Sequence, residues 1–481
     1  MSTVPLRTAA GTTIRPVDRF LPPPGAIVAL LVPLAAAVGG LVAISPQMGL
    51  GGAMALVFAT FVFLALPAAM GAWVAIAFAS GLPGLMGLPA ASTLLVALAW
   101  LATLPSRREH TAALRAASPL VLVAPWVLFA WMVLTGIWAP DRSVATSQLW
   151  LVFTAIATVP IIATAADTVR TVRILVAAYV GGAAMVVALA VVLGPSSYVA
   201  GDHSEGRLEV ANFSANLLGA VCATALVLVP ALWPIARTRL QRAVVVAAGA
   251  IIAYGLVGTE SRSGFIALFV AVLVALVVCH GRRTAILGLL LAGVVVLGAF
   301  VAVSPGILDR TTSGDSTGTG RTELWKAGLE VTRDHPLAGV GIGNFVVVSK
   351  DYSQKVGTLE FSDVLIEKPV PVHNTIIEAL AETGIVGLAL LVVAVGACMG
   401  ATRRAAHRLR AVGRPDLELT AQLVLIAQVA TLAAGMLLPI TYSRQLWMLL
   451  AIGPALLGIA MRMQAPGDDR APVRRRPWVR R

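Results

Sequence analysis

The sequence predicts an all-α polytopic membrane protein with about 12–14 transmembrane helices and one large outward-facing loop that contains short helices. First, 58% of the 481 residues are hydrophobic and only 12% are charged, about half the charged share of a soluble globular domain. Second, apolar runs close to the ~20 residues that cross a bilayer recur along the chain. Third, these runs show no alternation of apolar and polar residues, which excludes a β-barrel. A soluble enzyme of this size would need many more polar residues on its surface.

Fourteen apolar runs are predicted to be membrane helices, although several are shorter than a straight bilayer crossing requires. Pro67 separates the second run from the third, so this region forms either one long helix or a helical hairpin. We favour 14 spans, and 12 are the alternative if the region before Arg107 contains two spans rather than four. The runs lie near residues 26–44, 50–66, 67–80, 90–104, 118–138, 146–165, 172–193, 213–235, 243–258, 264–280, 284–303, 374–399, 419–438 and 443–461.

Arginines in alternate connections set the predicted orientation. These connections and the two termini hold 25 of the 36 basic residues and seven of the 23 acidic ones, a net charge of +18, whereas the rest of the chain carries −5. The positive-inside rule places them in the cytoplasm, and two cytoplasmic termini require an even number of spans. The net charge of +13 therefore reflects membrane orientation and does not indicate nucleic-acid binding.

This topology divides the chain into five segments. The fourth connection on the outward side, 304–373, holds all four lysines, yet its seven basic and nine acidic residues nearly balance. It is long enough to fold on its own, and long loops are usually functional, so we expect catalysis there. The segments are a cytoplasmic tail (1–25), a transmembrane bundle (26–303), the catalytic loop (304–373), C-terminal transmembrane helices (374–461) and a basic cytoplasmic tail (462–481).

The large loop contains one clear helical pattern and one glycine-rich turn. Apolar residues at helical spacing predict an amphipathic helix over Thr322–Asp334, which Pro336 ends. Gly339, Gly341 and Gly343 then predict a tight, bendable turn that returns the loop to the membrane. A phosphate-binding loop is the alternative, but the glycines follow no strand and no GK[ST] sequence is present.

Three outward arginines are candidates for anion binding. Arg262 lies between two apolar runs, where an arginine is costly unless it is paired or hydrated. It either faces a cavity as an anion site or lies at the interface, paired with Glu260. Arg207 and Arg321, each taken alone, are also compatible with ordinary surface charges.

His373 is the candidate general base. Asn374 is a plausible N-cap of the span that follows, so His373 precedes the positive end of a helix, which favours a neutral imidazole that can accept a proton from a sugar hydroxyl. A structural or capping histidine is the alternative. Glu378 and Glu382 lie one helical turn apart, and they either orient His373, pair with an arginine or face water.

Several arginines and one histidine on the outward side suggest a specific task. Arginine forks bind phosphate oxygens bidentately, and a lipid-linked diphosphate presents its phosphates at this depth. Arginines would also stabilise the charge that develops as the diphosphate leaves, so neither a metal nor another cofactor is needed. Asp309 and Asp315 leave a metal site as the alternative.

Four motifs follow one another between about residues 255 and 400, namely Ser261-Arg-Ser-Gly264, Gly320-Arg-Thr-Glu-Leu-Trp325, His335-Pro-Leu-Ala-Gly-Val-Gly-Ile-Gly-Asn-Phe345 and His373-Asn-Thr-Ile-Ile-Glu-Ala-Leu-Ala-Glu-Thr-Gly-Ile-Val-Gly387. Their order and the large outward loop resemble the O-antigen ligase and polymerase superfamily of bacterial membrane proteins. The resemblance extends more weakly to Arg207, Asn212 and Asn216, and the first 140 residues match only as apolar helices.

The resemblance implies a GT-C-like architecture and a metal-independent, inverting glycosyl transfer. The donor would be a glycan on an undecaprenyl-diphosphate-type carrier, and the acceptor a lipid, a wall glycan or a protein on the outer side of the bacterial cytoplasmic (inner) membrane. Membrane lipids would be the only other partners. Ligases of this type usually have about 12 spans, so the favoured count of 14 departs from the family.

The resemblance also assigns roles to residues of this chain. Arg262, Arg321 and, more weakly, Arg207 look like the residues that bind the donor diphosphate. His373 looks like the catalytic base or acceptor-positioning histidine, with Arg321 as its catalytic partner. The supporting residues would be Trp325, Asn374, Glu378 and Glu382.

Two alternatives stay open at this stage. A polymerase of the same fold would extend the lipid-linked glycan instead of joining it to another acceptor. A glycolipid flippase would transport the glycan without making a bond, and it would show internal repeats and charges deep in the spans. We find no convincing repeat, and the distinctive residues lie at the outer edge.

Overall fold

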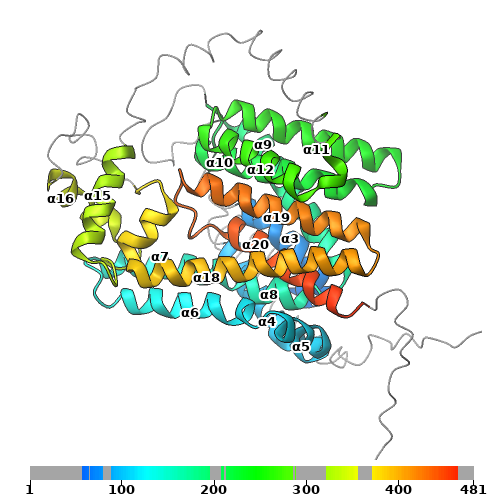
Figure 1. The fold of residues 1–481 in the computed structure, drawn as a ribbon, viewed down its shortest axis with the longest axis horizontal. Coiled ribbons are helices and arrows are strands. Elements are labelled where there is room, and N and C mark those ends of the chain that lie inside the picture. Colours follow the sequence, from blue (N-terminus) through cyan, green and yellow to red (C-terminus); the bar gives the residue numbers. More distant parts are fainter. Residues whose placement is uncertain are drawn as a thin grey trace, which may run out of the picture. The chain divides into compact units, whose positions relative to one another are not determined.

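The computed structural model describes residues 57–63, 65–79, 88–194, 207–210, 213–284, 288, 321–355 and 371–463. The chain divides into two compact units, Met1–Phe61 and Val62–Arg481, and the elements below belong to the second. Every regular element in these ranges is a helix, as the sequence predicts (Figure 1).

The first part of the described chain forms helices α3 (Leu66–Phe78), α4 (Leu88–Thr103), η2 (Leu104–Arg107), α5 (Arg108–Ala117), α6 (Leu120–Thr135), α7 (Arg142–Ile156), α8 (Thr158–Ala165), α9 (Val169–Leu193), α10 (Ala215–Leu228), η3 (Val229–Ile235), α11 (Arg239–Gly258), α12 (Arg262–Val278) and η4 (His280–Arg282). Next come α15 (Arg321–Asp334) and α16 (Phe345–Lys355), which lie in the predicted loop. The last three are α18 (Thr375–Ala411), α19 (Pro415–Gly435) and α20 (Arg444–Met461).

Seven stretches of the described chain are long and apolar enough to cross a membrane, and an eighth is possible if the bent pair Ala91–Ala117 and Leu120–Thr135 is one span. Two shorter apolar helices, α3 and α12, add to them. The protein is thus an all-α polytopic membrane protein. Of the predicted runs, 26–44, nearly all of 284–303 and about half of 50–66 lie outside the described residues, so the choice between 12 and 14 spans stays a prediction.

The core of the bundle forms around α18 and α20. Helix α18 packs against α6, α19 and α20, and α20 is buried along nearly its whole length (Figure 1). Small residues permit this close packing, because a Cβ atom at Gly453 would lie only 1.8 Å from Oγ1 of Thr402. The same Oγ1 accepts a hydrogen bond of 3.1 Å from Gln428 of α19, which ties the three helices together.

Helix α18 is longer than the predicted run 374–399 and it is kinked. Gly384 has φ = 66° and interrupts the helix one residue after Thr383. A kink in a membrane helix frees backbone groups that need other partners. Residues 336–344, which we call the strap, supply most of these hydrogen-bond partners. The contacts are Val340 N–H to Ala381 O (2.9 Å), Gly341 N–H to Glu382 O (2.9 Å), Ile385 N–H to Pro336 O (2.9 Å) and Trp131 Nε1–H to Thr383 O (2.9 Å).

Two glycines with positive φ make the contact between strap and kink possible. A Cβ at Gly339 would lie 2.3 Å from the carbonyl carbon of Glu382, and a Cβ at Gly384 would lie 2.2 Å from that of Leu337. Gly341, with φ = 102°, packs on Ala139 just after α6, where a Cβ would lie 2.7 Å from the Ala139 Cβ. The expectation of a tight turn is confirmed, and the expected bendability stays a prediction.

Candidate functional site

Four of the sequence candidates form one electrostatic group. Arg207 precedes α10, Arg262 and Arg321 are the first residues of α12 and α15, and His373 precedes α18. Burial lowers the pKa of Arg321, and the charges of Arg207 and Arg262 lower it further. The charge of Arg321 in turn adds to burial in lowering the pKa of His373. Residues far apart in the sequence therefore lie close enough at one end of the bundle for their charges to interact, and we call them the arginine–histidine group.

The motif Ser261-Arg-Ser-Gly264 places Arg262. Ser261 is the N-cap of α12, and its Oγ accepts a hydrogen bond of 3.2 Å from the Gly264 N–H. A Cβ at Gly264 would lie 2.8 Å from the backbone of Gly219, so this glycine lets α12 lie directly on α10. Both serines of the motif are buried in that contact, whereas Arg262 is exposed. The motif fixes the start of the helix and leaves the arginine free to bind a ligand.

Arg207 is held by neutral oxygens. Its Nε donates to the Thr259 carbonyl at 2.8 Å and its Nη2 donates to Oδ1 of Asn216 at 3.0 Å. Burial lowers the pKa of Arg207, while the nearby Glu260 and Glu209 raise it. Asn216 thus anchors this arginine, and the N-cap of α10 is Ser214. Asn212, to which the resemblance also extends, lies outside the described residues.

The predicted amphipathic helix positions Arg321. Helix α15 buries Leu324, Ala327, Gly328 and Val331, the four residues that the sequence pattern assigned to its apolar face. A Cβ at Gly328 would lie 2.6 Å from Cγ2 of Ile377, so α15 lies directly on the first turn of α18. This contact brings the first turn of α15 close to His373. Within the described part of the chain, neither Arg321 nor Arg262 forms a hydrogen bond or an ion pair.

His373 is neutral near pH 7, as the sequence indicated, but for another reason. Burial and then the charge of Arg321 lower its pKa to about 4. The argument from the helix N-terminus predicted the direction of the pKa shift of His373 correctly, but burial is the larger cause of that shift. The Nδ1 atom is buried and has no hydrogen-bond partner among the described residues, so it is available to a ligand.

Two non-glycine residues of the described chain have positive φ, and both lie at this site. Glu260 has φ = 47° and His373 has φ = 52°. Each directly precedes an N-cap residue, Ser261 in one case and Asn374 in the other. Such strained residues are found mostly where function requires them. At both residues the positive φ turns the chain sharply just before the next helix begins.

Two of the predicted supporting residues, Asn374 and Trp325, are held in different ways. Asn374 caps α18 as expected, with Oδ1 accepting from the N–H groups of Ile376 (2.9 Å) and Ile377 (3.1 Å). Trp325 packs against the small core of the loop, and its Nε1 has no partner among the described residues. Neither observation tests a role in catalysis.

Glu378 and Glu382 do not face water, and the structure gives them partners other than His373 and the arginines. Both are buried. Glu378 accepts a hydrogen bond of 2.8 Å from Thr441, and Glu382 accepts one from the Gly343 N–H (2.8 Å) and another from the Tyr442 hydroxyl. They therefore join α18 to the strap and to the turn before α20. No local pattern singles out Tyr442, because its role depends on a carboxylate 60 positions away.

No group of three or more His, Cys, Asp or Glu side chains that could hold a metal occurs in the described ranges. Asp309 and Asp315, the alternative metal ligands, lie outside those ranges. A cavity of about 660 Å³ lies beside the strap, lined among others by Trp138, His335 and Tyr352. It is at the far end of α15 from Arg321, roughly 20 Å along the helix axis.

Comparison with known proteins covers the region that holds three of the four grouped residues. Residues 247–392 match the O-antigen ligase family. This region is therefore similar to an O-antigen ligase domain. It contains Arg262, Arg321 and His373, whereas Arg207 lies before it. The match supports the resemblance stated from the motifs.

One curated relative adds to this match. The exopolysaccharide production protein ExoQ of Rhizobium meliloti (strain 1021) is 41% identical over 91 residues, which are 19% of this chain and 20% of the relative. The match thus spans about a fifth of the length of the relative.

Proposed function

We propose that this protein transfers a glycan from a lipid-diphosphate carrier to an acceptor hydroxyl, and that the arginine–histidine group is its active site. The observation that carries the proposal is the meeting of three arginines and a neutral histidine from four separate segments. Like charges repel, and a diphosphate relieves that repulsion in the site. The O-antigen ligase domain and the polysaccharide-producing relative support the same class of reaction.

The three arginines bind the donor in this proposal. Arg262 and Arg321 have uncommitted guanidinium groups in the described chain, which can each form two parallel hydrogen bonds with phosphate oxygens. Arg207, which is already anchored on Thr259 and Asn216, contributes mainly its charge. As the bond between the sugar and the diphosphate breaks, negative charge grows on the leaving phosphate, and the arginines stabilise it.

His373 activates the acceptor. Its neutral imidazole takes the proton of the acceptor hydroxyl while that oxygen attacks the anomeric carbon. A new carbon–oxygen bond forms on one side of the sugar as the bond to the diphosphate breaks on the other, so the configuration inverts. The products are the glycosylated acceptor, the lipid diphosphate and a protonated histidine. The protein groups supply both acid–base and electrostatic catalysis, without a metal.

The orientation is part of the proposal. Residues 304–373 form the catalytic loop on the outer side of the cytoplasmic membrane, and both termini are cytoplasmic, because arginines are concentrated in the alternate connections. The described helices α15 and α16 are the short helices of that loop.

The decisive experiment reconstitutes the purified protein with an undecaprenyl-diphosphate-linked glycan and candidate acceptors, with and without EDTA. We expect transfer of the glycan to a lipid, wall-glycan or protein acceptor, at the same rate in both conditions. Transfer only onto a second lipid-linked glycan would assign polymerase activity. Movement of the glycolipid across liposomes without any new glycosidic bond would contradict the proposal.

A further inference from the structure

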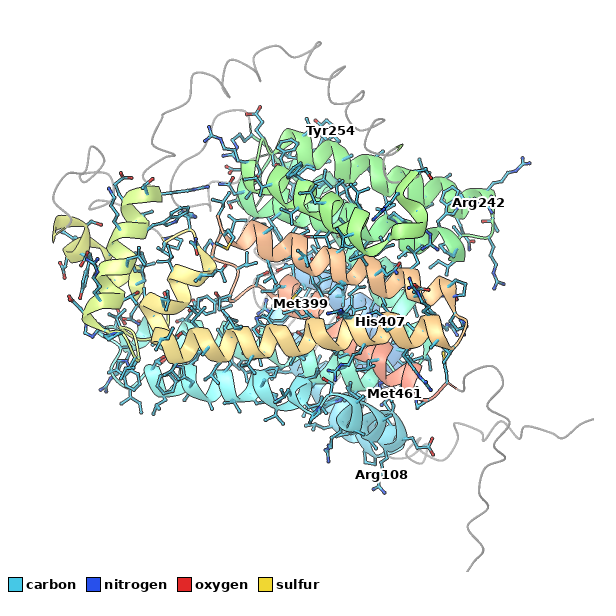
Figure 2. All side chains as sticks on the ribbon, in the orientation of Figure 1. Arg108, Arg242, Tyr254, Met399, His407 and Met461 are labelled. Carbon is cyan, nitrogen blue, oxygen red and sulfur yellow. The ribbon has the colours of Figure 1, made fainter. Side chains whose placement is uncertain are left out.

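A second polar pocket lies at the other end of the bundle. It has a volume of about 240 Å³ and is lined by residues of η2 and α5, by Asp167 between α8 and α9, and by Arg462 after α20. Helix α20 begins beside the turn that holds Tyr442 and is 18 residues, or about 27 Å, long, so Arg462 is far from the arginine–histidine group. Figure 2 shows Arg108 and Met461 at this end, where α5 contacts α20.

Three guanidinium groups and two carboxylates line this pocket. Arg107, Arg108 and Arg462 carry the positive charges, and Glu109 and Asp167 carry the negative ones. Asp167 engages two of the arginines, since its carboxylate is 3.9 Å from Nε of Arg107 and its carbonyl accepts a hydrogen bond from Arg462. The Nε of Arg107 is buried and has no hydrogen-bond partner among the described residues. The formal charge of the pocket residues is therefore positive, and the Nε–H of Arg107 is a donor without an acceptor in the described chain.

His110 adds a buried polar group to the pocket. It is only 1% exposed, and its Nε2 lies 2.9 Å from the Ala163 carbonyl. Its Nδ1 is buried without a partner in the described chain. The ring fits against Gly458, where a Cβ would lie 2.4 Å from Cε1. The pocket is thus lined by a tightly held histidine with one unpaired nitrogen, which is unusual because buried polar atoms are nearly always paired.

We propose that this pocket binds the phosphate group of an anionic phospholipid headgroup. Guanidinium groups that converge from separate helices suit a phosphate, and basic pockets between helix ends are known lipid-headgroup sites. The exposed apolar side chains of α4 reach Leu101, which is 55% exposed and precedes η2 by two residues, so acyl chains have a surface to lie on. A headgroup here would join η2 and α5 to the ends of α8 and α20.

The test measures thermal unfolding of the full chain in a neutral detergent as phosphatidylglycerol is added. We expect the apparent Tm to rise by several degrees with phosphatidylglycerol and by less than one degree with phosphatidylcholine. The R107Q/R462Q variant should lose most of that rise. R403Q is the matched control, because Arg403 is an exposed arginine of α18 near the same end, and it should keep the full rise.

Three results would overturn the proposal. One is an equal rise for wild type and R107Q/R462Q, another is a rise with inorganic phosphate alone, and the third is no rise with either anion. R462Q covers the case in which the double variant does not fold, because Arg462 is exposed and its replacement leaves the half-buried Arg107 in place. It should need at least about three times more phosphatidylglycerol than wild type for half of the rise.

Discussion

Two sets of arginines lie at opposite ends of the bundle, and they differ in how their side chains are paired. At the end where α18 begins, Arg262 and Arg321 form no hydrogen bond or ion pair within the described chain. At the end where α18 finishes, Arg173 pairs with Asp416 at 2.9 Å and Arg410 with Glu418 at 2.7 Å. The uncommitted arginines are thus on the side where the sequence as a whole is less basic.

This difference shows how to interpret a basic membrane protein. Most of its arginines are in the connections that the positive-inside rule predicts to be cytoplasmic, and several of those described pair with a nearby carboxylate or carbonyl. An arginine that is half-buried among other arginines, as Arg321 is, costs free energy until an anion binds. In the proposed active site, the absence of pairing within the described chain is what distinguishes Arg262 and Arg321 from the arginines that pair with Asp416 and Glu418.

The largest effect is expected for R321A. Loss of this guanidinium should lower glycan transfer by about 10²–10³-fold or more, because it removes a donor aimed at the developing charge. R321K should recover only part of the activity, since a lysine keeps the charge but loses the fork. R333A on the same helix is the control, because Arg333 is exposed and paired with Glu330, and it should transfer normally. Equal activity of R321A and R333A would remove Arg321 from the site.

A similar loss is expected for H373A, about 10²–10⁴-fold, because a general base is removed.

The pKa of about 4 for His373 also predicts a pH profile. Transfer by wild type should stay flat from pH 8 to pH 6 and fall only as the pH approaches 4, when His373 becomes protonated. In R321Q the pKa of His373, measured by NMR on labelled histidine, should rise part of the way toward 6.5, since burial remains. An unchanged pKa would separate Arg321 from His373.

Next in size is G384A, which affects stability. Alanine at φ = 66° is strained, and its Cβ would lie 2.2 Å from the Leu337 carbonyl carbon, so we expect a loss of about 2–4 kcal/mol and displacement of the strap. G396A in the same helix is the matched control, because a Cβ there meets nothing within 4 Å. It should be neutral or stabilise by up to ~1 kcal/mol. Thermal unfolding in detergent measures both, and equal Tm values would refute the strap as a fixed contact.

The smallest effect is expected at the opposite end. R410Q removes an ion pair whose arginine is largely exposed, so stability should change by less than about 1 kcal/mol. Glycan transfer should be unchanged, because Arg410 is remote from the arginine–histidine group. A large loss of transfer in R410Q would mean that the two sets of arginines are not functionally distinct.

Local patterns in the sequence predicted local structure well. The helical spacing around Arg321 gave both the helix and its buried face, and Asn374 was identified as a cap, because both depend on neighbours within four residues. The kink at Gly384 was not predictable in this way, since it is stable only with the strap paired to it. For the same reason the burial of Glu382 was missed: its partners Gly343 and Tyr442 are distant in sequence.

The sequence and the resemblance predicted the candidate site as a set of residues on the outward side, but not the interactions within it. Charge and apolar context singled out Arg207, Arg262, Arg321 and His373, while only the structure shows that their charges act on one another. The direction of the His373 pKa was predicted, but its main cause, burial, depends on how α15 covers the start of α18.

Binding of a lipid diphosphate to the purified protein tests the central claim most directly. The probe is undecaprenyl diphosphate, and the proteins compared are wild type, R262A/R321A and the control R403Q. The account predicts at least a tenfold weaker affinity for R262A/R321A and an unchanged affinity for R403Q, with all three equally stable without the probe. Equal affinity of R262A/R321A and wild type would contradict the assignment of these arginines to the donor diphosphate.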